Sequence, residues 1–154
     1  MDVLFEDHGG VAGVPEQGKV HALVMDAMGD DLSYYEEVNI RVVSESEGRA
    51  LNLEFRQRDK ATNVLSFPFD DPPGVESGIL GDIAVCAQVV QQEARQQHKT
   101  FEDHFAHMVV HGILHLRGFD HTNDYEAEKM ETLEIEVLEK HGIKNPYMGD
   151  AVNE

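Results

Sequence analysis

The stretch His111-Gly112-Ile113-Leu114-His115-Leu116-Arg117-Gly118-Phe119-Asp120-His121 decides both the fold and the chemistry that we predict for this chain. It closes a helical segment that Thr100 and Asp103 open as a capping pair and that runs to about Leu116. Gly118 can adopt a positive φ angle, which ends the helix and turns the chain back. The stretch therefore predicts a helix, a glycine turn and then a third histidine.

The histidine spacing within this stretch indicates a metal site. His111 and His115 are four residues apart, so their imidazoles leave the same helix face one turn apart. Two such nitrogens can reach one ion at the ~2.0–2.1 Å that zinc requires, and the turn can deliver His121 as a third ligand. Three neutral ligands leave one position open, as in catalytic zinc sites. We predict one Zn²⁺; packed or solvated histidines are the alternative.

Outward from this stretch, the periodicity predicts a mixed set of helices and strands. We expect helices over 15–29, 44–55, 88–97, 100–116 and 123–141, and strands over 38–43, 63–69 and 79–86. This order predicts an α+β fold, with a small mixed sheet of about four strands covered by helices and one metzincin-like His-x-x-x-His helix. We find no linker or internal repeat, so residues 1–154 are expected to form one domain.

Composition narrows the function classes. The only cysteine, Cys86, excludes an internal disulfide and indicates a reducing compartment. No apolar run approaches the ~18 residues that span a bilayer, and Met1 to Asp7 lack the basic segment of a secretory signal. We therefore expect a soluble, cytoplasmic protein without a membrane partner.

The charge distribution predicts where an anion could bind. The formal net charge is −18, which argues against nonspecific nucleic-acid binding. Residues 41–60 nevertheless carry five basic against four acidic side chains, whereas residues 121–140 carry two against seven. Anion contacts should therefore involve the 41–60 region. The acidic side chains of the last helix, Glu134 among them, are expected to face solvent.

The spacing His-x-x-x-His-x-x-Gly-x-x-His matches the long zinc-peptidase signature except at one position. Those peptidases have a glutamate after the first histidine as their general base, and this chain has Gly112 there. Glycine cannot take a proton from water, so a metallopeptidase is only a minor alternative.

The same stretch closely resembles the signature of the YbeY family, His-Gly-x-Leu-His-Leu-x-Gly-Tyr/Phe-Asp-His. A second block, Leu51 to Phe69, is similar to that family's Leu-Asn-x-x-Tyr/Phe-Arg-x-Lys-Asp-x-Pro-Thr-Asp/Asn-Val-Leu-Ser-Phe-Pro-Phe, and Gly81-Asp82-Ile83 resembles its Gly-Asp-Ile/Val strand. The resemblance covers about residues 38–147. Arg58 stands where the family commonly has lysine, and Ala61 where it commonly has proline.

The resemblance implies a zinc-dependent endoribonuclease that acts on single-stranded RNA. It implies roles in maturation of the 3′ end of 16S rRNA and in late quality control of the 70S ribosome. His111, His115 and His121 would hold the metal, and Arg56 would act in catalysis or RNA binding. The implied partners are the 16S rRNA precursor and the ribosome or its small subunit with its proteins; no DNA is expected. A ribosome-assembly factor with a structural zinc and little nuclease activity is the alternative.

Arg56 also has a physical interpretation, since a guanidinium can hold two phosphate oxygens as charge develops on them. A surface residue or a carboxylate partner is the alternative for Arg56.

For other residues near the motifs the sequence leaves two roles open. His107 could support the site or pack in the helix, Asp120 could orient an imidazole or shape a turn, and Asp82 and Ser66 could reach the cleft or pack.

Overall fold

The computed structural model describes residues 1–148 and contains one four-stranded sheet. Its strands are β1 (Asp2–Asp7), β2 (Glu37–Val43), β3 (Val64–Pro68) and β4 (Ile79–Cys86), in the spatial order β1-β2-β4-β3. The first three strands in that order are parallel, and β3 is antiparallel to β4. The predicted α+β class with a mixed sheet is confirmed.

Strand β1 is a strand that we did not predict individually. Only Val3 of its six residues is buried, because β1 is an edge strand and most of its side chains face water. Its sequence therefore lacks the apolar alternation that identifies the inner strands. The short 3₁₀ helix η1 (Gly29–Ser33) was also not predicted.

The helices lie close to their predicted bounds. They are α1 (Gln17–Met28), α2 (Glu45–Arg56), α3 (Ala87–Gln96), α4 (Phe101–Leu116) and α5 (Asp124–Lys140). The side-chain oxygens of Ser44, Thr100 and Asn123 accept hydrogen bonds from backbone N–H groups three residues on, at 3.2, 3.1 and 2.9 Å. These N-caps satisfy N–H groups that the first helical turn leaves unpaired, which sets where α2, α4 and α5 begin.

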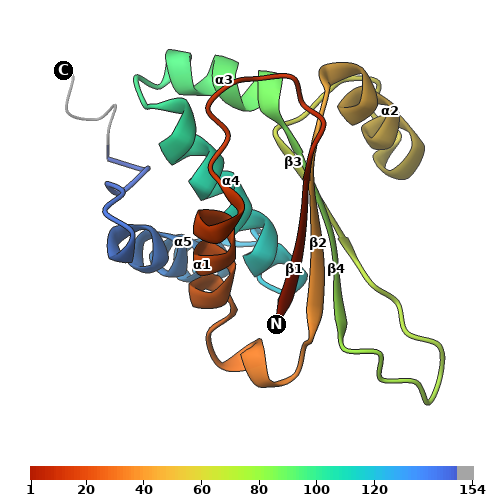
Figure 1. Ribbon diagram of the computed structural model, residues 1–154. Coiled ribbons are helices and arrows are strands. Elements are labelled where there is room, and N and C mark those ends of the chain that lie inside the picture. The colour runs from red at the N-terminus through yellow and green to blue at the C-terminus, as the bar shows by residue number, and fades with distance from the viewer. Residues whose placement is uncertain (149–154) are drawn as a thin grey trace.

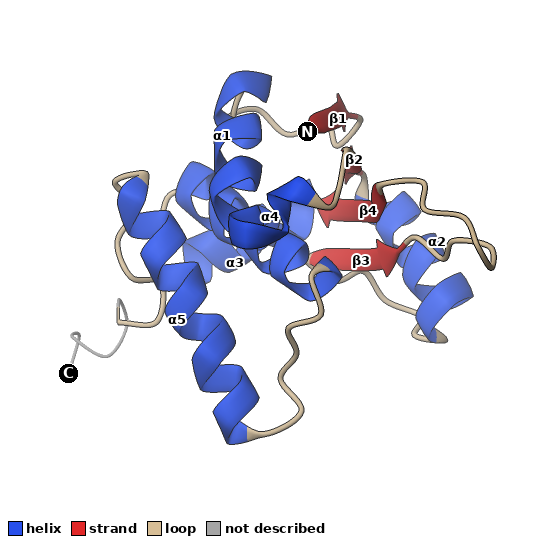
Figure 2. Ribbon diagram, turned by 90° about the horizontal axis from the view of Figure 1, so that it is seen from below, coloured by secondary structure: helices blue, strands red, loops and turns tan. Residues whose placement is uncertain are grey.

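The elements form layers around the sheet. Helices α1, α3 and α4 cover one face, and α2 lies on the opposite face beside β3 and β4 (Figures 1 and 2). Helix α5 forms an outer layer that packs on α4 and α1 (Figure 2). Helix α4 is therefore enclosed between the sheet, two neighbouring helices and α5.

Burial follows this arrangement. Phe105, Val109 and Ile113 of α4 are fully buried, together with Ile40 and Val85 of the inner strands. Burying a side chain of this size contributes roughly 1.5–3 kcal/mol, so α4 is held mainly by apolar packing. No helix in the part of the chain that the structure describes is long and apolar enough to cross a membrane.

Candidate metal centre and its cleft

His111, His115 and His121 converge at the carboxyl end of α4. One nitrogen of each imidazole lies within 4.8 Å of the others. The Nε2 atoms of His111 and His115 are 3.1 Å apart, and the rings of His111 and His121 stack with centroids 5.2 Å apart. The structure therefore brings together the three side chains that the sequence singled out.

The local chain geometry explains how the third histidine arrives. Gly118 has φ +102°, a value that L side chains rarely adopt, and it follows the last turn of α4. Arg117 anchors the start of the loop by donating to Asp31 at 2.9 Å and to the carbonyl of Ala27 at 2.8 Å. The carboxylate of Asp120 accepts from the backbone N–H of His121 at 2.7 Å, which agrees with the predicted role of Asp120 in shaping the turn.

The three nitrogens suit a divalent cation. Bond lengths of ~2.0–2.1 Å around a tetrahedral zinc place ligand atoms roughly 3.3 Å apart, close to the observed 3.1 Å between the two helical imidazoles. Burial lowers the pKa of His115, and the neighbouring His111 and His121 lower it further. The ring of His115 is therefore neutral at physiological pH, with a lone pair to give to a cation.

His111 and His115 line a cleft of about 370 Å³ that also contains Arg56. Arg56 ends α2 on the opposite face of the sheet, and its side chain reaches around the edge strand β3. It donates to the backbone carbonyl of Ser66 at 2.8 Å, and its guanidinium lies 5.5 Å from the ring centroid of Phe67. Ser66 also lines this cleft, so one of its two predicted roles, reaching the cleft, agrees with the structure.

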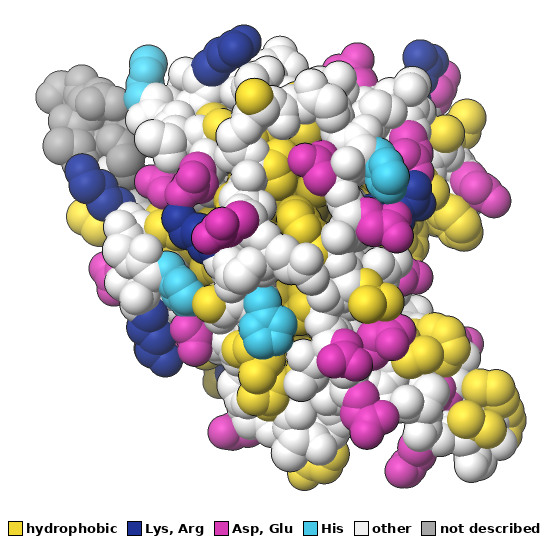
Figure 3. Space-filling view, viewed as in Figure 1, with side chains coloured by type: hydrophobic (Ala, Val, Ile, Leu, Met, Phe, Trp, Pro, Cys, Tyr) yellow, Lys and Arg dark blue, Asp and Glu magenta, His cyan; other side chains and the backbone are white. Residues whose placement is uncertain are grey.

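The basic side chains near Arg56 differ in their partners. Arg41 pairs with Glu47 at 2.7 Å, and Arg49 pairs with Asp59 at 2.6 Å. Within residues 1–148, Arg58 and Lys60 have no ion-pair partner and are exposed. On the face of the molecule that Figure 3 shows, the side chains of Asp and Glu outnumber those of Lys and Arg. Local positive charge is thus available after α2 in a strongly acidic protein.

A buried acidic residue corrects one of our predictions. Glu134 was expected to face solvent with the other acids of the last helix, but it is 0% exposed. Its Oε2 lies 2.5 Å from Nδ1 of His111 and its Oε1 lies 3.0 Å from Nε2 of His107. The hydroxyl of Tyr147 also donates to Oε1. The burial of Glu134 could have been predicted from the sequence. Met130, Glu134 and Leu138 are spaced four residues apart, which places Glu134 on the buried face of α5.

A second concavity of about 450 Å³ adjoins the first and shares Asn63 and His111 with it. In its wall, Glu93 accepts from His104 at 2.9 Å and from Asn63 at 3.1 Å. The hydrogen bond from His104 lowers the pKa of Glu93, so this carboxylate is ionised at neutral pH.

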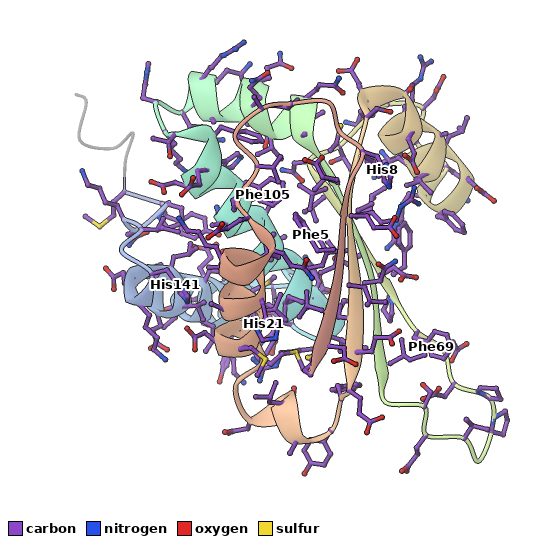
Figure 4. All side chains as sticks on the ribbon, in the orientation of Figure 1. Phe5, His8, His21, Phe69, Phe105 and His141 are labelled. Carbon is purple, nitrogen blue, oxygen red and sulfur yellow. The ribbon has the colours of Figure 1, made fainter. Side chains whose placement is uncertain are left out.

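Other candidate residues lie elsewhere. Asp82 does not line the cleft of the histidines: it pairs with Phe67 in the β3–β4 register and borders cavities with Asn39 on the sheet face that carries α2. The histidines outside the 98–121 cluster sit on separate parts of the fold, with His8 after β1, His21 on α1 and His141 after α5 (Figure 4).

The structure also explains Gly112 at the position where peptidases carry their base. A Cβ atom built on Gly112 would lie 3.0 Å from Cδ1 of Ile83. The position faces the sheet at close range, so it has no room for a glutamate and does not point at the cleft.

The fold and the site together define a small α+β protein with a three-histidine group that could bind a metal ion, beside an arginine in an open cleft. The family model described as "Endoribonuclease YbeY" matches residues 16–142. The chain belongs to the YbeY endoribonuclease family, which assigns it hydrolase activity on RNA. It is also similar to the solution structure of TM1509 from Thermotoga maritima, with 30% identity, 92% coverage of each chain and a TM-score of 0.54.

Proposed function

We propose that the protein is a zinc-dependent endoribonuclease specific for single-stranded RNA, acting in 3′-end maturation of 16S rRNA and in late 70S ribosome quality control. The chemical part of the proposal rests on one observation: His111, His115 and His121 converge, and the first two of them line a cleft together with Arg56. Family membership supports the RNA substrate, and the ribosomal role extends the family resemblance.

The histidines and the basic side chains have different roles in this proposal. The three imidazoles would hold one Zn²⁺, which when bound supplies Lewis acidity at a phosphate oxygen and lowers the pKa of water at the site towards ~7. Arg56 binds the scissile phosphate through two N–H groups and stabilises the charge that develops there. The exposed Arg58 and Lys60 contact neighbouring phosphates.

The test combines metal analysis with cleavage of a single-stranded RNA. His115→Ala should lose both zinc and cleavage, and Arg56→Glu should retain zinc and lose cleavage. Arg95→Glu, the same charge change on the exposed side of α3, and His8→Ala should behave as wild type. Unchanged zinc stoichiometry in His115→Ala would refute the ligand assignment, and full activity in Arg56→Glu would remove that arginine from the reaction.

The same assay identifies the nucleophile from the product ends. A 2′,3′-cyclic phosphate indicates attack by the ribose hydroxyl, whereas a 5′-phosphate with a 3′-hydroxyl indicates attack by water.

The net charge of −18 favours one alternative, an assembly factor whose zinc is structural and which depends on a partner for RNA contact. Cleavage of naked RNA only at near-stoichiometric enzyme, with turnover restored on ribosomal particles, would support this alternative.

A further inference from the structure

Glu134 is a buried carboxylate for which apolar packing offers no explanation. It lies at the interface of α5 and α4 with an exposed fraction of 0%, where an ionised group loses its hydration. Three donors replace that hydration: His107 Nε2 and the Tyr147 hydroxyl at Oε1, and His111 Nδ1 at Oε2. Both carboxylate oxygens therefore accept hydrogen bonds from protein side chains.

The contact to His111 determines which nitrogen of that ring carries the proton. A carboxylate only accepts hydrogen bonds, so Nδ1 of His111 must donate at 2.5 Å. In the neutral form of the ring this leaves the lone pair on Nε2, the atom that lies 3.1 Å from Nε2 of His115. The carboxylate thus holds His111 in the tautomer and orientation that a metal ligand needs.

His107 and Tyr147 hold the carboxylate in turn. Burial lowers the pKa of His107, so its ring is neutral and donates from Nε2; its Nδ1 has no hydrogen-bond partner within the described residues. Burial and the Glu134 carboxylate raise the pKa of Tyr147, so its hydroxyl remains a donor. The segment after α5 therefore closes over Glu134 through Tyr147.

We infer that Glu134 is a positioning residue that orients His111 for the cation and sets the metal affinity of the site. The inference rests on the proposed function, because it takes His111 as a metal ligand. A carboxylate that accepts from a ligating imidazole raises its basicity, and loss of such a partner typically reduces metal affinity about 10- to 100-fold. The competing explanation is a buried ion pair that only joins α4 to α5.

The test compares zinc affinity in wild type, Glu134→Gln and the control Glu136→Gln, which changes an exposed acid on the same helix. Glutamine keeps the shape of the side chain and removes its charge. We expect the zinc Kd, measured by competition with a chromophoric chelator, to rise about 10- to 100-fold in Glu134→Gln alone. The visible spectrum of bound Co²⁺ should also change in Glu134→Gln. Circular dichroism spectra of the metal-free proteins check that each variant is folded.

The outcomes separate the two proposals. Equal zinc Kd values and equal Co²⁺ spectra in wild type and Glu134→Gln would overturn the positioning role and leave the proposed function standing. Wild-type protein that binds no zinc would overturn both.

A measurement on the wild type avoids dependence on folding of the variant. Long-range ¹H–¹⁵N spectra of the metal-free protein should show His111 protonated at Nδ1. Protonation at Nε2 alone would overturn the inference.

Discussion

Ser66 donates its hydroxyl to the carbonyl oxygen of Gly112 at 3.3 Å, while its own backbone carbonyl accepts from Arg56 at 2.8 Å. One residue of an edge strand thus connects the arginine of α2 with the histidine helix α4, although the two helices lie on opposite faces of the sheet (Figure 1). Within residues 1–148 the guanidinium of Arg56 makes no other side-chain hydrogen bond, so this contact holds it at the cleft.

Arg56→Lys should lower kcat by about 10²- to 10³-fold while zinc content stays unchanged. Lysine keeps the charge but cannot present two parallel N–H groups to a phosphate or make the same contact with Phe67. Single-turnover RNA cleavage and metal analysis check this, with Arg95→Lys as the matched control. A variant with wild-type kcat would show that a point charge is sufficient.

His121→Ala should abolish zinc-dependent stabilisation without changing the metal-free protein. The side chain of His121 is exposed and lies on a loop, so its loss removes a ligand and little packing. At a free zinc concentration 100 times Kd, binding should raise the unfolding free energy of the wild type by about 2.7 kcal/mol. Thermal unfolding with and without buffered Zn²⁺ measures this. A full zinc-induced shift in His121→Ala, equal to that of His8→Ala, would contradict the assignment.

Gly112→Glu should destabilise the protein by about 3 kcal/mol or more and should not create peptidase activity. The new side chain would meet Ile83 at 3.0 Å from its first atom and would bury a charge against the sheet. Urea unfolding and a peptide-library assay provide the measurements. Gly18→Glu is the control, since Gly18 lies on α1 with nothing within 4 Å of its Cβ position. Zinc-dependent peptide cleavage by Gly112→Glu would be evidence against our placement of this residue.

Glu93→Gln should reduce the loss of stability in acid. The hydrogen bond from His104 places the pKa of Glu93 in the folded state below its ordinary value of 4.5. A lowered folded-state pKa contributes stability that is present above pH 4.5 and is lost as the pH falls through the folded-state pKa. Melting temperatures between pH 6 and about pH 3 should therefore fall less steeply in Glu93→Gln than in wild type. Parallel curves would mean that the Glu93–His104 pair does not contribute to acid sensitivity.

Most elements could be predicted because their local signals agree with the tertiary structure. Strand β4 has the predicted bounds, Ile79–Cys86, since most of it is buried and apolar residues dominate on both sides of Gly81-Asp82. The caps at Ser44 and Thr100 marked the starts of α2 and α4. Strand β1 gave no comparable signal, because an edge strand with one buried residue has no apolar pattern to detect.

The part of the candidate site that comes from one short stretch of sequence could be predicted. Helix spacing and the turn at Gly118 bring the three histidines together, so their grouping follows from residues 111–121 alone. Arg56 could be placed beside them only through family resemblance, since its approach depends on the order of β3 and β4 in the sheet. Glu134 was assigned to the wrong environment because the acidic residues of α5 were treated as one exposed group.

Helix α4 owes its place to apolar side chains such as Phe105 and Ile113, which are fully buried, whereas His121 is carried by an exposed loop. The packing of the core and the placement of the third candidate ligand therefore depend on different parts of the chain. A substitution in the loop at His121 should therefore change metal binding with little effect on the packing around α4.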